Sequence, residues 1–301
     1  MLRSEKGITR RVFHKAKFGV DRFILVQTYK IHYVEAGAGE PVILIPGSYS
    51  TYRVWNRLMP LLAGDFRVLA LDYVGTGDSD KPVKGFDYTI QEQTDIIMKM
   101  IRQMGLEKVN LIGGAYGGAI VFDFAARYPE LTNKIVSIEA GVVKPDTKKG
   151  DPLEYCLKFP VIGDIFVRIV RSGVLNKPAA KAIAGQWYSS MTPTEKKEVM
   201  DQVASNAKSA SRIPWYKISL ARKMSENIEE AAKSIKAPVL YIYGTKSDFK
   251  EIHLEKNLKF LSTYLPHAWI EAIEGGIHDL AMQKPAEVAD LILEFLRNKQ
   301  S

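Results

Sequence analysis

The sequence predicts an α/β protein whose doubly wound, mostly parallel sheet is interrupted by a helical insertion. Apolar, β-branched runs typical of buried strands alternate with segments of helical periodicity, and this alternation is characteristic of parallel βαβ units. Residues 145–233 break the alternation, because they contain several prolines and helical segments but no convincing buried strand. The composition, with 46% hydrophobic and 25% charged residues in a chain of 301, is that of an ordinary globular protein.

The elements expected before the insertion begin with a hairpin and continue with three apolar strands. The hairpin is formed by residues 23–28 and 30–37, and the strands cover 41–47, the run that ends at Asp72, and 108–114. A helix is expected between the second and third of these strands. It is indicated by Ile90, Ile97 and Ile101 at helical spacing, and Thr89 can cap its start.

The elements expected after these complete the alternation on both sides of the insertion. They are a helix that follows residue 118, and then a strand over 134–141, a strand over 238–244, a helix near 252–262, a strand over 268–273 and a final helix over 285–299. We therefore expect a core formed by residues 1–144 and 234–301 and a helical cap formed by residues 145–233.

The positive charge is concentrated in two parts of the chain. The sequence carries 42 basic and 34 acidic residues, which gives a formal charge of +8. Residues 1–30 contribute +6 and residues 145–233 contribute +5, whereas the rest of the chain contributes −3. We interpret this charge first as a solvated face, with an anionic substrate or a membrane surface as alternatives. No aromatic-interleaved basic motif accompanies it, so nucleic acid is not an expected partner.

The location expected for the chain is the cytoplasm. No apolar stretch approaches the roughly 18 residues that span a bilayer, and no apolar segment of signal-peptide length follows the basic start. Cys156 is the single cysteine, so no internal disulfide can form. The histidines do not cluster at ligand spacing, and neither a metal nor a cofactor is expected.

The most informative motif is a glycine-crowded turn between a strand and a helix, in the segment NLIGGAYGGAIVF. This context suits a nucleophile elbow, G-x-S-x-G, in which small neighbours allow a strained turn to lift one side chain above the sheet. Gly113, Ala115 and Gly117 fill that frame, so alanine occupies the nucleophile position. A frame shifted by one residue would instead place Tyr116 there, and a merely structural glycine turn is a further alternative.

With these residues the chain resembles the α/β-hydrolase family over nearly its whole length, including the segment LIPGSYSTYRVWNRLMPLLAGDFRVLALDYVGTGDSDKP. The resemblance implies the α/β-hydrolase fold and an oxyanion hole made by the backbone amides of Ser48 and Tyr116. The family usually has His-Gly where this chain has Pro46-Gly47. The resemblance also implies that His278 is the general base and that Asp248 orients it, with Glu139 as an alternative acid.

The alanine at residue 115 leaves two explanations open for the function. The chain is either a hydrolase of the capped ester or C–C type that is hydrolytically silent because its nucleophile has been removed, or a protein that naturally lacks one. In the second case it binds a ligand or uses His278 as a base, as cofactor-free dioxygenases and hydroxynitrile lyases of the family do. The expected partner is a small apolar or aromatic molecule, and the candidate pocket residues are Tyr49, Trp55, Trp187 and Trp215.

Overall fold

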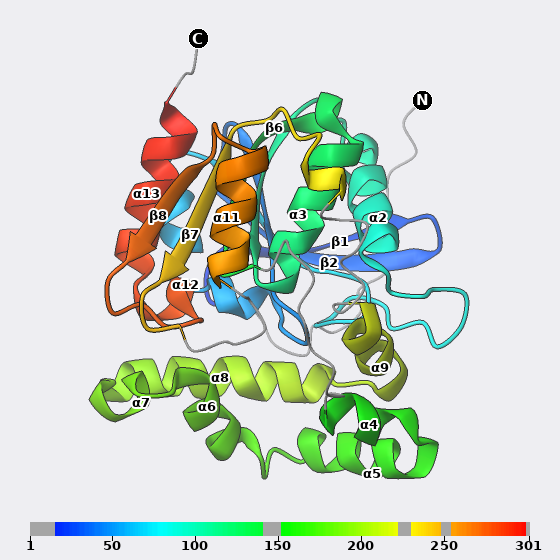
Figure 1. Ribbon diagram of the computed structural model, residues 1–301. Helices are drawn as coiled ribbons and strands as arrows, with labels where there is room; N and C mark the ends of the chain where they lie inside the picture. The colour runs from blue at the N-terminus through cyan, green and yellow to red at the C-terminus, as the bar shows by residue number, and fades with distance from the viewer. Residues whose placement is uncertain (1–15, 141–151, 222–229, 248–253, 299–301) are drawn as a thin grey trace.

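The computed structural model describes residues 16–140, 152–221, 230–247 and 254–298 (Figure 1). Its centre is an eight-stranded sheet in the order β1-β2-β4-β3-β5-β6-β7-β8. The strands are β1 (Val20–Val26), β2 (Tyr29–Ala36), β3 (Pro41–Ile45), β4 (Arg67–Asp72), β5 (Val109–Gly114), β6 (Thr132–Ile138), β7 (Val239–Gly244) and β8 (Trp269–Ile273). In the described parts of the chain, no helix combines the length and the apolar character needed to cross a membrane.

The pairing of the strands confirms the predicted mostly parallel sheet. β1 pairs with β2 and β2 pairs with β4 in antiparallel fashion, whereas the pairs from β4 through β3 and β5 to β8 are all parallel. The carboxyl ends of β3, β5, β6 and β7 therefore meet at one edge of the sheet. In open sheets of this kind, ligands bind in the crevice outside those ends.

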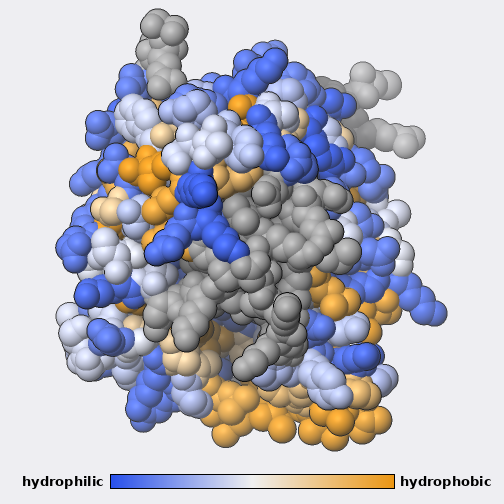
Figure 2. All heavy atoms as spheres, viewed as in Figure 1, coloured by the Kyte–Doolittle hydropathy of each residue, from blue (hydrophilic) through white to orange (hydrophobic). Residues whose placement is uncertain are grey.

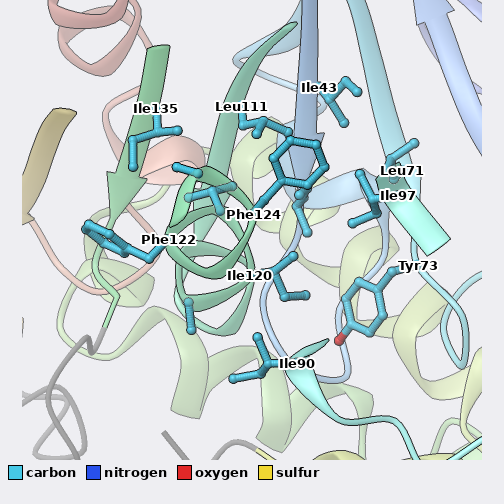
Figure 3. Close-up of a cluster of buried hydrophobic side chains, with 14 of the residues drawn as sticks. Ile43, Leu71, Tyr73, Ile90, Ile97, Leu111, Ile120, Phe122, Phe124 and Ile135 are labelled. Carbon is cyan, nitrogen blue, oxygen red and sulfur yellow. The ribbon is translucent and has the colours of Figure 1, made fainter. Parts of the chain in front are cut away.

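Helices cover both faces of the sheet, each with its own buried cluster. One face is covered by α2 (Ile90–Gln103), α3 (Tyr116–Arg127) and α11 (Leu254–Tyr264), and Figure 3 shows Ile97 of this cluster beside Leu71 of the sheet. The other face is covered by η1 (Tyr52–Trp55), α1 (Met59–Leu62), α12 (Leu280–Gln283) and α13 (Pro285–Arg297). This double covering explains why the central strands are apolar on both sides.

The expected helix after residue 89 forms for the predicted reason. The Thr89 side chain accepts a hydrogen bond from the amide of Glu92 at 3.1 Å, which caps the start of α2. Ile97 and Ile101 are buried on the face that packs on the sheet. The hydrophobic periodicity therefore fixes both the position of this helix and the face that it buries.

The helical insertion, which we define as α4 to α9, lies between β6 and β7 in the chain. Its helices are α4 (Pro152–Lys158), α5 (Pro160–Arg171), α6 (Asn176–Ala184), α7 (Trp187–Ser190), α8 (Pro193–Ser209) and α9 (Arg212–Ala221). Figure 1 shows them across the end of the molecule to which β7 and β8 point. A hydrogen bond from the Thr51 amide to Asn206 Oδ1, 3.1 Å long, joins α8 to the loop after β3.

Candidate functional site

Ala115 occupies a strained turn between β5 and α3. Its backbone has φ of 47° and ψ of −115°, a conformation that non-glycine residues rarely adopt. The Ala115 amide donates to the carbonyl oxygen of Ile138 at 2.8 Å, which ties the turn to the end of β6. This strained turn between a strand and a helix has the geometry expected of a nucleophile elbow, with a methyl group at its tip, and we call it the elbow.

The glycines around this turn are required by close backbone contacts. A Cβ on Gly117 would lie 2.2 Å from the carbonyl oxygen of Ile45, and a Cβ on Gly113 would lie 2.2 Å from the oxygen of Gly117. Both distances are shorter than any van der Waals contact allows. The G-x-A-x-G spacing thus lets α3 start directly against the end of β3.

The loop after β3 runs beside the elbow. A Cβ built on Gly47 would be 3.4 Å from the Ala115 Cβ. Ser48 is the next residue in the chain, so its backbone begins at this contact. Tyr116 is the first residue of α3, and the first amides of a helix have no partner within the helix. Main-chain donors at a helix start suit an anionic oxygen, which is the chemistry expected of Ser48 and Tyr116.

Tyr73 anchors the loop after β3, a role that the sequence did not indicate. Its hydroxyl donates to the carbonyl oxygen of Gly47 at 3.1 Å and is also hydrogen-bonded by the main chain of Tyr49. Burial, with the neighbouring Tyr116 and Tyr49 phenols, raises the pKa of Tyr73 well above its usual value, so the phenol stays protonated and continues to donate. Tyr73 directly follows Asp72, but no local pattern reveals where its hydroxyl points.

Glu139 and His278 form an acid–base pair at the same edge of the sheet. His278 Nδ1 lies 3.4 Å from Glu139 Oε2, and the exposed fractions of the two side chains are 19% and 2%. Glu139 immediately follows Ile138, whose carbonyl oxygen binds the Ala115 amide. The pair therefore belongs to the strand end next to the elbow.

Two further loops hold this pair in place. Glu139 accepts hydrogen bonds from the Gly244 amide and from the Ser247 hydroxyl, the latter at 2.6 Å. On the other side, Gln283 of α12 accepts from the amide of Ile277 at 2.7 Å, next to His278. The carboxylate and the imidazole are thus both positioned by neighbouring groups, as an orienting acid and a base require.

Asp248, the acid favoured by the sequence analysis, lies outside the described residues. Its neighbour Ser247 donates a hydrogen bond to Glu139, so the described chain reaches this site at the residue before Asp248. Asp279 adds a second carboxyl group beside the histidine. Burial raises the pKa of Asp279; the charge of His278 opposes this shift and the charge of Glu139 adds to it.

Backbone strain is concentrated at this edge of the sheet. In the described parts of the chain, five non-glycine residues have positive φ, and three of them are Tyr49, Ala115 and Glu139, with φ of 61°, 47° and 53°. These three residues follow β3, β5 and β6. Such conformations persist where the surrounding structure holds them, and they are common at functional sites.

The four candidate pocket aromatics lie in different surroundings. The rings of Tyr49 and Trp215 are 5.1 Å apart, which brings α9 of the helical insertion against the loop after β3. Trp55 is 1% exposed and packs in the core beneath Gly114, so we do not propose it as a pocket residue. Trp187 packs with Ala180 and other residues of the helical insertion.

A separate buried network surrounds His32 on β2. His32 Nδ1 lies 2.7 Å from Asp72 Oδ2, and Nε2 lies 3.1 Å from Asp21 Oδ1. Asp72 also accepts from the amides of Tyr52 and Asp78, so it stabilises the loop after its strand. His32, Asp72 and Asp78 bring ligand-type atoms within 4.8 Å of one another. Because Asp72 and both ring nitrogens have protein partners, we assign no metal to this group.

Comparisons with known proteins agree with this geometry. Residues 40–163 match the family model described as alpha/beta hydrolase fold. The soluble epoxide hydrolase of Corynebacterium sp. (strain C12) is 26% identical over 296 residues, which cover 90% of this chain and 95% of that protein.

Two solved structures superpose over almost their whole length. The bromoperoxidase of Bacillus anthracis has a TM-score of 0.74 at 23% identity, covering 92% of this chain and 100% of that one. The 2-hydroxy-6-oxo-6-phenylhexa-2,4-dienoate hydrolase of Rhodococcus sp. strain RHA1 has a TM-score of 0.73 at 18% identity, covering 93% and 99%. The chain therefore has the α/β-hydrolase fold.

Proposed function

We propose that this chain is a member of the α/β-hydrolase family that binds a small apolar or aromatic ester-like or C–C bond substrate at the elbow, where it forms no covalent intermediate. In this proposal His278 is the base, Glu139 is the acid that orients it, and residue 115 is the vacant nucleophile position. The observation that carries the proposal is the 3.4 Å contact between His278 and Glu139 beside an intact elbow.

The orientation of the imidazole supports the role of His278. A Nδ1–H that donates to the Glu139 carboxylate makes Nε2 the basic nitrogen of the ring. The buried carboxylate also stabilises the imidazolium that forms when Nε2 takes a proton. His278 can therefore remove a proton from a water molecule or from a substrate without any change of tautomer.

The methyl group of Ala115 excludes reactions that need a nucleophile at residue 115. Acyl transfer needs a hydroxyl at this position, and the dehalogenases and epoxide hydrolases that the chain resembles have an aspartate there. A methyl group supplies neither an oxygen nucleophile nor a proton. Reactions that need only a base and an oxyanion hole remain accessible, with the Ser48 and Tyr116 amides as donors.

The helical insertion supports an apolar substrate, and we propose that α4 to α9 act as a cap over the site. The contact between Trp215 and Tyr49 places an aromatic pair beside the oxyanion loop. A cap of this kind excludes water and offers an apolar wall to a small aromatic molecule.

Restoration of one hydroxyl group tests the proposal. We expect Ala115→Ser to gain turnover of short aryl esters, and a second change, His278→Ala, to lower that turnover by about 10²- to 10⁴-fold. Ala126→Ser, which adds a hydroxyl to α3 away from the elbow, is the matched control and should gain none. No gain with any ester of the panel would count against an ester-type site.

The alternative, a protein that only binds its ligand, is favoured by the same methyl group. This alternative predicts a different result when the unchanged chain and the Ala115→Ser variant are compared with the same compound. A compound that raises the Tm of the unchanged chain, and that neither this chain nor Ala115→Ser consumes, would favour binding alone. A compound that the unchanged chain converts, and that His278→Ala does not, would favour base catalysis.

A further inference from the structure

Most of the exposed large hydrophobic side chains lie on the helical insertion. In the described parts of the chain, fifteen large hydrophobic side chains are exposed, and nine of them lie between residues 155 and 183. We define the apolar patch as six of them: Tyr155, Phe159, Val161, Ile162, Ile165 and Ile169. Figure 2 shows apolar atoms gathered along the edge of the molecule where α5 lies in Figure 1.

The geometry of α5 explains why the apolar patch remains exposed in the folded protein. Val161, Ile162, Ile165 and Ile169 fall within a sector of about 100° on a helix with 3.6 residues per turn. A neighbouring sector, which includes Val167, packs against Leu157 and Trp215 of α4 and α9. Because one apolar sector is already used by the core, the second faces outward, with Val161 72% exposed and Ile162 56% exposed.

Positive charge borders the patch. Arg168 and Arg171 are exposed and lie on the third sector of α5, and Lys158 is exposed at the end of α4. The acidic residue on this helix, Asp164, is paired with Arg212 of α9 at 2.9 Å. Lys177 and Lys181 of α6 add two more exposed cations. Residues 152–184 thus carry five basic and two acidic residues.

An apolar helix face bordered by cations matches the chemistry of an anionic bilayer surface. Side chains such as Ile162 and Ile165 can enter the boundary between headgroups and acyl chains, while the arginines contact lipid phosphates. A second copy of the chain fits less well. In a two-fold interface the same cations would face one another, and interface cores are depleted of charge.

We propose that the apolar patch and its bordering cations form a peripheral docking surface for membranes that contain anionic phospholipids. The cluster of Leu157, Val167 and Trp215 underlies this surface, and Trp215 in turn contacts Tyr49 of the loop beside the elbow. A membrane bound at α5 is therefore separated from that loop by one packed layer of side chains. This inference does not depend on the reaction at residue 115.

Vesicle sedimentation of the full chain tests this surface. We expect binding to vesicles of phosphatidylcholine with phosphatidylserine and much weaker binding to phosphatidylcholine alone. Raising the salt from about 0.1 M to about 0.5 M should weaken the binding. Arg168→Gln with Arg171→Gln should lower the partition coefficient about tenfold or more, since each cation near the surface contributes. Ile162→Glu with Ile165→Glu should abolish it.

A matched control separates the patch from apolar surface in general. Leu25→Glu with Val83→Glu introduces the same charges at two other exposed apolar positions and should leave binding unchanged. Far-ultraviolet circular dichroism and Tm show whether each variant is folded. Deletion of residues 1–15 should also leave binding unchanged, because the docking surface lies on α4 to α6.

Three results would overturn the inference. The first is the absence of binding to either kind of vesicle. The second is binding that survives in the Ile162→Glu, Ile165→Glu variant or is lost on deletion of residues 1–15, which would place the membrane contact elsewhere. The third is a dimer in light scattering that the patch variant converts to a monomer without any vesicle binding, which would assign the patch to a second copy of the chain.

Discussion

Glu139 connects three loops of the site through one buried carboxylate. It follows β6, accepts from the Gly244 amide at the end of β7 and from the Ser247 hydroxyl after β7, and faces His278 after β8. Its own backbone has a φ of 53°, so the chain is bent to bring the carboxylate to this point. At the residue scale, the candidate site is organised around the Glu139 carboxylate.

The identity of the orienting acid can be tested with the nucleophile restored. In the Ala115→Ser background, we expect Glu139→Gln to lower kcat by about 10²-fold or more, because the amide does not stabilise the imidazolium. Asp248→Asn should have a smaller effect. The measurement is ester turnover as a function of pH. A larger loss with Asp248→Asn than with Glu139→Gln would return the role to Asp248.

The Tyr73 hydroxyl anchors the loop after β3, which we propose to carry an oxyanion donor. Tyr73→Phe removes the hydrogen bonds to Gly47 and to the main chain of Tyr49, and we expect a loss of about 1 to 3 kcal/mol in unfolding free energy. In the Ala115→Ser background, kcat should fall more than KM rises, because the loop supplies a transition-state donor. Denaturant titration and steady-state kinetics measure the two effects. Unchanged values of both would contradict the anchoring role.

The buried His32 makes stability depend on pH. Burial lowers its pKa, but the hydrogen bonds to Asp21 and Asp72 outweigh that effect and raise the pKa to about 9, against 6.5 for the unperturbed group. The folded state therefore holds the proton more tightly than the unfolded state. The resulting stabilisation, at most about 3 kcal/mol, is complete below pH 6.5 and is lost as the pH rises through 9.

Urea titrations between pH 6 and pH 10 measure this loss. We expect the decline in unfolding free energy over that range to disappear in His32→Gln. It should persist in His267→Gln, since that histidine is exposed and makes one long contact to a carbonyl oxygen. An equal decline in His32→Gln and in the unchanged chain would show that other groups cause it.

At the scale of elements, the elbow depends on the fit between α3 and β3. Gly117→Ala should place a Cβ 2.2 Å from the Ile45 oxygen and 2.7 Å from the Pro46 oxygen. We expect a loss of about 3 kcal/mol or more in unfolding free energy, because backbone atoms on both sides must move. Gly64→Ala, where a Cβ meets nothing within 4 Å, is the matched control and should change stability little. Equal effects of the two substitutions would contradict the packing described.

Some of these elements and residues could be predicted from the sequence because their signals are local. Helix α2 is indicated by Thr89 and by its isoleucine spacing, and the elbow is indicated by the four glycines around Ala115 in the segment GGAYGG. The pairing of Glu139 with His278 has no such signal, since it requires β6 to lie next to β5 and the loops after β7 and β8 to converge. Trp55 lies close to the loop after β3 in sequence, but it is buried because η1 packs onto the sheet.

At the scale of the whole molecule, the sheet and the helical insertion divide the properties of the chain. The sheet edge provides the elbow, the loop after β3 and the contact between Glu139 and His278, whereas the insertion provides the aromatic contact and the basic apolar surface. Residues 145–233 contribute +5 and residues 1–30 contribute +6 to the net charge of +8, so the rest of the chain, which includes most of the sheet, carries a net charge of −3. We infer that one part of the molecule holds the chemistry and that the other governs what approaches it.

The central claim is that this site is complete except for one oxygen atom, and intact-protein mass spectrometry tests it most directly. After reaction with a p-nitrophenyl alkylphosphonate, whose serine adduct is not hydrolysed in turnover, Ala115→Ser should carry one phosphonyl group, and peptide mapping should place it at residue 115. The unchanged chain should carry none. A phosphonyl group at residue 115 or at another active-site residue of the unchanged chain, or an Ala115→Ser variant that folds and remains unlabelled, would contradict the claim.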